Sequence, residues 1–323
     1  NSLRASQELV SRFPEDPTSW SQLGRTKIFL SSFDSADSAF YEALRRNPDF
    51  PGAKIGLLGC RYARGDLSGA IDGLRNLLDQ PDLNDLARFE GLIIWNNLGL
   101  AGLLAEAGRC REAISVLESA EHLTGGGAEN KLKPNMGRGH VLLRMEKYAE
   151  ALDQVQDLTN YTPEPSLSIR EASFVQVKAL VALGRLAEAD SIIAGLKGIN
   201  SGVSDKDEMG WGKWAYLTPI LMAEVSLARD DPAAVFAYLE PILGWRRVAH
   251  WWAIDMWMNM AAAHRMEGDH AKAEFELMDL LSVHGGHALA HLQLGSLYEE
   301  MNRADEAIKS YEKFLDMWSE ADD

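Results

Sequence analysis

Apolar side chains recur along the chain in one pattern, which starts at an alanine and continues four and seven residues later. In the first occurrence these residues are Ala36, Phe40 and Ala43. Spacing of i, i+4 and i+7 places three side chains on one face of an α-helix. The alanine returns after 34, 43, 38, 38, 45, 39 and 34 residues, giving the series Ala36, Ala70, Ala113, Ala151, Ala189, Ala234, Ala273 and Ala307. The pattern therefore predicts one helical unit that is used eight times.

A second helix is expected in front of each of these, with a short turn between the two. Twelve residues before the alanine, five units carry a small residue that lets a neighbouring helix approach closely; these are Gly24, Ala101, Gly139, Ala261 and Gly295. Five residues before it, Gly65, Gly108, Gly184 and Gly268 suit a helix end, because glycine adopts the left-handed conformation without a Cβ penalty. Each unit is thus predicted to be a helical hairpin.

The first and last units match a known repeat most fully. The matching residues are Trp20, Leu23, Gly24, Ala36, Phe40, Ala43 and Pro48 in the first unit, and Leu294, Gly295, Tyr298, Ala307, Tyr311 and Phe314 in the last. In this order and spacing they resemble the tetratricopeptide repeat (TPR), a hairpin of two helices. The resemblance implies an all-α fold: a right-handed α-solenoid of about eight TPR-like helical hairpins with a concave inner surface.

The repeat also divides the chain. Residues 1–16 are expected to be a truncated repeat helix, which makes an N-terminal half-repeat, and residues 17–321 a TPR array. The units are expected near 17–50, 51–83, 94–127, 132–165, 170–203, 215–248, 254–287 and 288–321. Because Asn1 stands where a helix is already expected, we also expect a longer protein upstream.

Composition narrows the classes of function. The 323 residues include 48 Asp and Glu against 32 Lys and Arg, a net charge of −16, whereas a nucleic-acid binder needs a basic face. No run of eighteen apolar residues is present, so no membrane span is expected. Cys60 and Cys110 cannot form a disulfide framework and have no zinc-type spacing. With no signal peptide visible, we expect a cytoplasmic protein without a nucleic-acid partner.

Enzyme motifs are missing from the sequence. There is no phosphate-binding loop, no GxSxG turn and no HExxH motif. His287 and His291 have the i, i+4 spacing that can bind a metal ion, but no carboxylate or cysteine stands at ligand spacing beside them. We therefore predict a protein that is not an enzyme, with no cofactor, no metal site and a structural or surface role for these histidines.

The resemblance indicates which residues line the inner surface, because the first helix of each TPR hairpin faces the groove. In the middle of the array those positions form an apolar strip with a basic flank: Trp95, Leu98, Met136, Phe174 and Tyr216, beside Lys133, His140 and Lys178. Aromatic and methionine side chains supply adaptable contact area, and lysine can orient an acidic group. The strip is expected to bind a partner peptide or helix; the alternative is that the repeats bury it against one another.

Tryptophans gather around the sixth unit, outside the repeat pattern. These are Trp211, Trp214, Trp245, Trp251 and Trp252. They are interpreted either as caps on irregular helices or as an aromatic patch for a partner or for self-association, since tryptophan is enriched at interaction hot spots.

The function predicted from these features is a protein–protein interaction scaffold that binds a partner peptide or helix in its concave groove. Residues 311–322 resemble the terminal repeat of bacterial TPR regions in regulatory proteins, so the chain is expected to be the regulatory or sensor region of a larger bacterial signalling protein. Two alternatives stay open. One is a small-molecule-sensing regulatory domain with an aromatic pocket near the sixth repeat, and the other is a self-assembling structural TPR protein.

Overall fold

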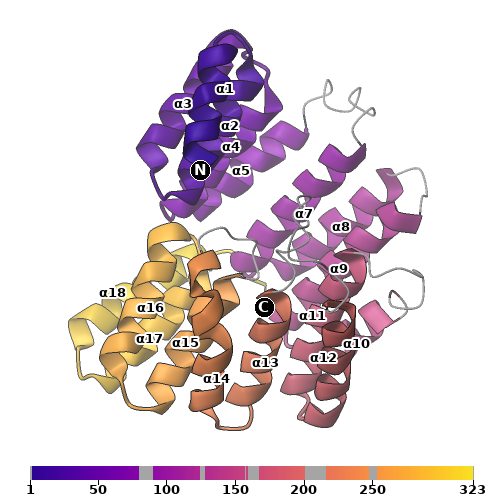
Figure 1. Ribbon diagram of the computed structural model, residues 1–323, viewed down its shortest axis with the longest axis vertical. Helices are drawn as coiled ribbons and strands as arrows, with labels where there is room; N and C mark the ends of the chain where they lie inside the picture. The colour runs from indigo at the N-terminus through magenta and orange to yellow at the C-terminus, as the bar shows by residue number, and fades with distance from the viewer. Residues whose placement is uncertain are drawn as a thin grey trace.

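The computed structural model describes residues 2–79, 90–123, 128–156, 158, 167–200, 216–246 and 253–322, and every regular element in these ranges is a helix (Figure 1). A single helix, α1 (Ser2–Arg12), comes first. The others form hairpins: α2 (Pro17–Phe29) with α3 (Phe33–Arg46), α4 (Pro51–Ala63) with α5 (Leu67–Leu78), α7 (Glu90–Glu106) with α8 (Cys110–Leu123), α9 (Ala128–Arg144) with α10 (Tyr148–Gln156), α11 (Leu167–Ala182) with α12 (Leu186–Asn200), α13 (Leu217–Leu227) with α14 (Pro232–Leu239), α15 (Ile254–Met266) with α16 (His270–Val283), and α17 (Ala288–Glu300) with α18 (Ala304–Met317). The predicted all-α solenoid is confirmed.

The repeated alanines mark the closest contacts between helices. Ala36, Ala70, Ala113, Ala151 and Ala189 are all 0% exposed. At such positions a larger side chain has no room, because protein interiors are close-packed. The alanine of the repeat pattern is therefore explained by packing.

Phe40 shows how the small residues of the first helices are used. Its ring is 0% exposed and lies against α2 and α4. A Cβ atom added to Gly24 would lie 2.5 Å from the ring, and one added to Gly56 would lie 2.2 Å from it. Both helices thus carry glycine where the ring is seated.

The turns inside the hairpins share one backbone conformation. Four of them use glycine with positive φ, namely Gly65, Gly108, Gly184 and Gly268, and four others place Ser31, Glu146, Asp230 and Asn302 at φ between 54° and 58°. In seven units this residue stands five positions before the repeated alanine. The common conformation ends the first helix and reverses the chain.

In unit six the same count corrects the predicted register. Five positions after Asp230 comes Val235, which is 0% exposed, while Ala234 is half-buried. Leu239, four residues further, is also 0% exposed. The repeat position is therefore Val235, and α14 gives way after Leu239 to the 3-10 helix η4 (Glu240–Trp245), since Pro241 has no N–H to continue an α-helix.

The first helices of successive hairpins form one layer. Contacts run from α2 to α4, and from α7 through α9, α11 and α13 to α15. We call the side of this layer that faces the middle of the array the inner face. Each first helix also contacts the second helix of its own hairpin, so the second helices cover the outside.

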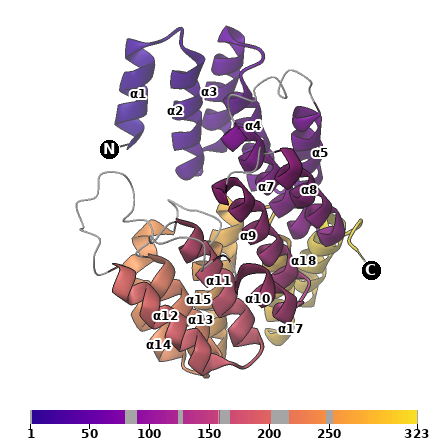
Figure 2. The same cartoon turned by 90° about the vertical axis from the view of Figure 1, so that its right-hand side faces the viewer.

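The array closes on itself, because the last two units return to units two and three (Figures 1 and 2). The Gly285 N–H donates to the Ala63 carbonyl at 3.1 Å, and the Asp322 N–H donates to the Gly108 carbonyl at 3.0 Å. The Trp318 Nε1–H donates to the Glu106 carbonyl at 2.7 Å. We call this contact the seam; its residues are Gly285, Trp318, Glu320 and Asp322 on one side, and Ala63, Glu106, Gly108, Arg109 and Arg111 on the other.

Candidate partner-binding surfaces

The structure buries the middle of the predicted apolar strip. Met136 is 4% exposed and Phe174 is 2% exposed, so neither offers much surface to a partner. Leu98 and Tyr216 are partly buried against the hydrophobic core, and Lys133 is partly buried as well. Trp95 belongs to α7, but its side chain lies outside the described residues.

Three members of the strip do lie together. The ring of His140, on α9, is 5.7 Å from that of Phe174, on α11, and the Nζ of Lys178 lies 5.3 Å from the centre of the same ring. Burial, reinforced by the nearby Lys178 charge, lowers the pKa of His140 to about 3. His140 is therefore neutral at physiological pH, and it adds no positive charge to the inner face.

The expectation of a basic strip is corrected at Lys178. Its Nζ lies 2.5 Å from Asp255 Oδ1 on α15 and 3.7 Å from Glu224 Oε2 on α13. Burial lowers the pKa of Lys178, but the two carboxylates outweigh this effect and raise it. Glu224 stands directly after a position that the repeat assigns to the inner surface, and Asp255 stands two residues before Trp257. The strip predicted from the repeat pattern included neither acid.

A second ion pair continues this polar region toward the seam. Arg144, at the end of α9, pairs with Glu106 at the end of α7, and Nε2 of His287 lies 3.8 Å from Glu106 Oε1. Burial raises the pKa of Glu106, but Arg144, the neighbouring histidines and a hydrogen bond from the Ala288 N–H together outweigh it and lower the pKa, so the carboxylate stays ionised. His287 Nδ1 accepts a hydrogen bond from the Ala290 N–H at 3.1 Å, and this bond assigns the remaining proton of the neutral ring to Nε2.

We call these six residues the inner cluster: Glu106, Arg144, Lys178, Glu224, Asp255 and His287. With His287 neutral, the cluster carries two positive and three negative charges. The side chains of its two ion-paired groups are 15% to 25% exposed. They are thus accessible in part and held by partners from several first helices.

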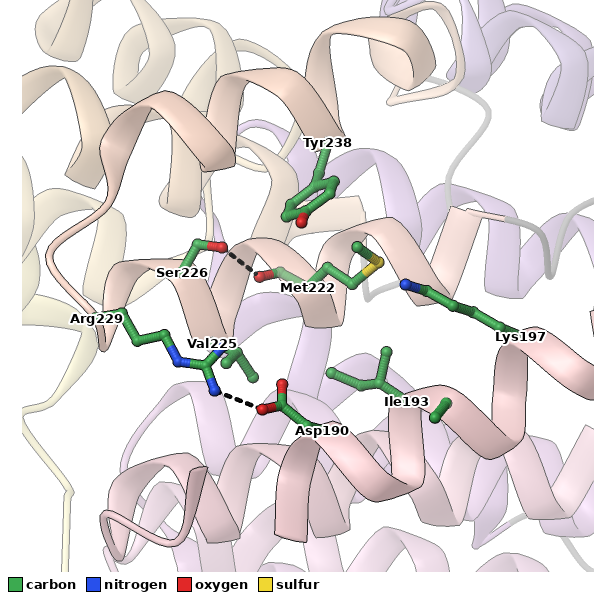
Figure 3. Close-up of a pocket in the computed structure, with 9 residues that line it drawn as sticks. Asp190, Ile193, Lys197, Met222, Val225, Ser226, Arg229 and Tyr238 are labelled. Carbon is green, nitrogen blue, oxygen red and sulfur yellow. Dashed lines mark hydrogen bonds and ion pairs between the residues drawn. The ribbon is translucent and has the colours of Figure 1, made fainter. Parts of the chain in front are cut away.

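A pocket lies on another part of the array, between units five and six (Figure 3). Its volume is about 240 Å³, and α12, α13 and α14 line it. Ile193 and Val225 form an apolar floor, and the side chains of Lys197 and Tyr238 point toward Met222 from two sides. At one edge, Arg229 pairs with Asp190 at 2.5 Å.

Comparison with known proteins identifies the repeats. Models of the tetratricopeptide repeat match residues 21–82 and residues 288–317. The chain therefore carries tetratricopeptide repeats in these two segments. No curated protein sequence matches it.

The comparison with solved structures finds two further similarities. A tetratricopeptide repeat protein from Parabacteroides merdae shares 12% identity, with a TM-score of 0.46, over 97% of this chain and 93% of that one. A chain in the APC/C hetero-tetramer Cut9–Hcn1 shares 14% identity, with a TM-score of 0.48; the alignment covers 99% of this chain and 59% of that one.

Most of the expected aromatic patch falls outside the part of the TPR array that the structure describes. This applies to Trp211, Trp214, Trp251 and Trp252, and also to the side chain of Trp245, which ends η4. The patch therefore stays a prediction.

The histidines near the last TPR hairpin have structural contacts. His287 caps α17, and Nε2 of His291 lies 3.1 Å from the Gly285 carbonyl oxygen. Within the described ranges, no group of three or more potential ligand side chains is placed to hold a metal ion. In the same ranges, no helix is both long and apolar enough to cross a membrane.

Proposed function

We propose that this chain binds a segment of a partner protein on the inner face of its TPR array, in contact with the inner cluster. The observation that supports this is the cluster itself. Side chains of both signs, from helices that are distant in sequence, stand partly exposed on one surface. TPR arrays are in general protein-interaction scaffolds without catalytic activity of their own, and we extend both properties to this chain.

The charges favour a different partner from the acidic one suggested by the sequence. Lys178 is already neutralised by Asp255 and Glu224, so an incoming carboxylate would have to displace one of them. A basic group instead meets an excess of acid in the cluster, and the net charge of −16 attracts a basic partner over a distance. We therefore propose a segment that carries basic side chains next to apolar ones.

Affinity capture with matched variants tests this proposal. The full chain, Glu224→Gln and the control Glu118→Gln, an exposed residue of α8, are compared by quantitative mass spectrometry of the proteins they retain. We expect a partner that the control keeps and Glu224→Gln loses, with weaker capture at high salt because exposed charge interactions are screened. Equal capture by all three chains at every salt concentration contradicts an inner-face site.

The pocket between units five and six supports a second candidate function, the sensing of a small molecule. An apolar floor with one ammonium group suits a small carboxylic acid. Such a ligand should raise the melting temperature by mass action, and Lys197→Gln should abolish the shift. A library of small acids that leaves the melting temperature unchanged contradicts this function.

The finer parts of the proposal have separate tests. A role in a larger bacterial signalling protein rests on the sequence of residues 311–322 and is tested by reading the whole gene.

Self-assembly is the third candidate function. Phe275 and Met278 on α16, which are 61% and 51% exposed, provide an apolar surface for it. Light scattering over a range of concentrations tests it, and a constant particle mass contradicts it.

A further inference from the structure

The seam is a docking contact between segments that are far apart in the chain. Arg109 Nη1 lies 2.5 Å from Glu320 Oε2, and the Arg111 N–H donates to Asp322 Oδ2 at 2.6 Å. These partners are separated by 211 residues in sequence. Together with the bonds of Trp318 and Gly285, they join the last two units to units two and three.

Residues 318–322 fit this surface in shape as well as in charge. A Cβ added to Gly108 would lie 2.6 Å from the Cβ of Ala321 and 3.1 Å from the ring of Trp318. Gly108 therefore provides both the left-handed turn, at φ of 73°, and the room for the segment. The segment brings two carboxylates to a surface that offers the Arg109 guanidinium and the Arg111 N–H in the first turn of α8.

The seam combines polar and apolar contacts. Met317 is the residue of α18 that packs against the hydrophobic core of units two and three, and the Tyr62 and His284 rings meet at a centroid distance of 6.2 Å. Hydrogen bonds and ion pairs make the remaining contacts, and these exchange readily for bonds to water. Polar contacts between parts of one chain resemble transient protein interfaces.

Two buried polar atoms beside the seam, Glu106 Oε2 and His284 Nε2, have no hydrogen-bond partner among the described residues. A buried polar atom without a partner costs free energy, which opening to water would recover. This cost offsets part of what the bonds of the seam contribute to the closed arrangement.

We propose that the seam is a releasable latch, in which residues 318–322 dock reversibly on the α7–α8 turn and their release opens the inner face. A TPR array without the latch is a solenoid whose units contact only their neighbours, and it can widen without unfolding. Opening separates the surroundings of Glu106 and His287, which belong to the inner cluster. A partner that binds the inner face shifts the equilibrium toward the open form; this last step alone rests on the proposed function.

Hydrogen exchange on the isolated chain tests the latch without any partner. The amides of Gly285, Arg111 and Asp322 report on the seam, since each N–H bonds across it. The Arg185 amide, which bonds to the Leu180 carbonyl, is the reference, because it stands in the turn of unit five that corresponds to the α7–α8 turn. We expect the seam amides to exchange through an opening that is more frequent than global unfolding.

A matched pair of variants completes the experiment. Trp318→Phe combined with Asp322→Ala removes the indole donor and the carboxylate, and should speed exchange at Gly285 by about tenfold or more while Arg185 is unchanged. Gly285 is the reporter for this variant, because neither substitution removes its own bond to the Ala63 carbonyl. Asp316→Ala removes an exposed carboxylate of α18 and should change the exchange of neither amide. Small-angle scattering should show a larger radius of gyration for the double variant. Seam amides that exchange only with global unfolding, or a double variant that matches Asp316→Ala, overturn the latch and leave the inner-face proposal standing.

Discussion

Neighbouring units meet mainly through apolar side chains, whereas the end of the chain meets units two and three through backbone hydrogen bonds and ion pairs as well as the apolar packing of Met317. Phe40 represents the first kind of interface, with a fully buried ring seated on glycines of two helices. Trp318 represents the second, with a bond from its indole to a backbone carbonyl. Apolar burial is the main source of folding free energy, while polar contacts contribute less and depend more on solvent conditions. The array is therefore expected to be firm along the chain and adjustable at the seam.

The largest effect is expected from breaking an interface between neighbouring units. Phe40→Ala leaves a cavity beside Gly24 and Gly56 and should lower the free energy of unfolding by about 3–5 kcal/mol. Phe275→Ala, at a residue 61% exposed, should change it by less than about 0.5 kcal/mol. Chemical denaturation measures both variants, and equal losses would contradict the packing assigned to Phe40.

Lower pH should weaken the inner face and the seam before it affects the apolar interfaces. Burial lowers the pKa of His284 to about 4, with a smaller contribution from His287 and an opposing one from Glu106, and the pKa of His140 is about 3. Because the unfolded chain takes up these protons first, the stabilisation is complete above pH 6.5 and is lost as pH falls toward 4. Within this window, each of the two histidines lowers the free energy of unfolding by about 1.4 kcal/mol for each pH unit.

Denaturation curves between pH 7 and pH 5 measure this loss. His284→Asn should flatten the pH dependence, whereas the apolar variant Phe40→Ala should keep the slope of the parent chain. A slope that is unchanged in His284→Asn contradicts the role of this ring.

A glycine at the seam sharpens the comparison further. In Gly285→Ala, the new Cβ would lie 2.5 Å from the Ala63 carbonyl oxygen and 3.0 Å from the Gly65 nitrogen. Overpacking of this kind costs about 1–3 kcal/mol, and here the seam can open to relieve it. We expect a modest loss of stability with a larger radius of gyration by scattering; a loss without any change in radius would show that the seam stays shut.

The smallest effects separate backbone conformation from packing. Neither Gly184 nor Gly195 has an atom within 4 Å of an added Cβ, but Gly184 has φ of 71° and Gly195 lies inside α12. Gly184→Ala should destabilise the chain by about 1 kcal/mol, because alanine is strained at positive φ. Gly195→Ala should stabilise it by about 0.5–1 kcal/mol through helix propensity. Thermal melts that show the same sign for both would contradict the turn conformation.

The hairpins could be predicted because each one is local. A buried alanine, a left-handed turn and an apolar face fall within one unit, so their spacing is readable in the sequence. Unit six was read one residue early, since Ala234 satisfies the pattern as well as Val235 does and only the Asp230 turn sets the register.

The inner face was harder to predict because it depends on how tightly neighbouring units pack. The repeat pattern places Phe174 and Lys178 on the inner surface. In the structure, Phe174 is buried in the hydrophobic core, and Lys178 forms ion pairs with acidic residues of two other units. The seam had no sequence signal, since it results from small rotations summed over the whole array. The Gly285–Gly286 pair is the feature of the sequence that the seam explains, because the seam leaves no room for a side chain there. A Cβ on Gly286 would lie 2.5 Å from the ring of Tyr62.

The seam also restricts how this gene can change. In an open solenoid, a repeat can be duplicated or deleted while the remaining units keep their neighbours. Here the last hairpin meets units two and three only when the number of hairpins between them completes the turn. Gain or loss of one unit would separate Trp318 from Glu106. The number of repeats is thus a geometric requirement of the closed array, and natural variants of this protein should differ in loop length before they differ in repeat count.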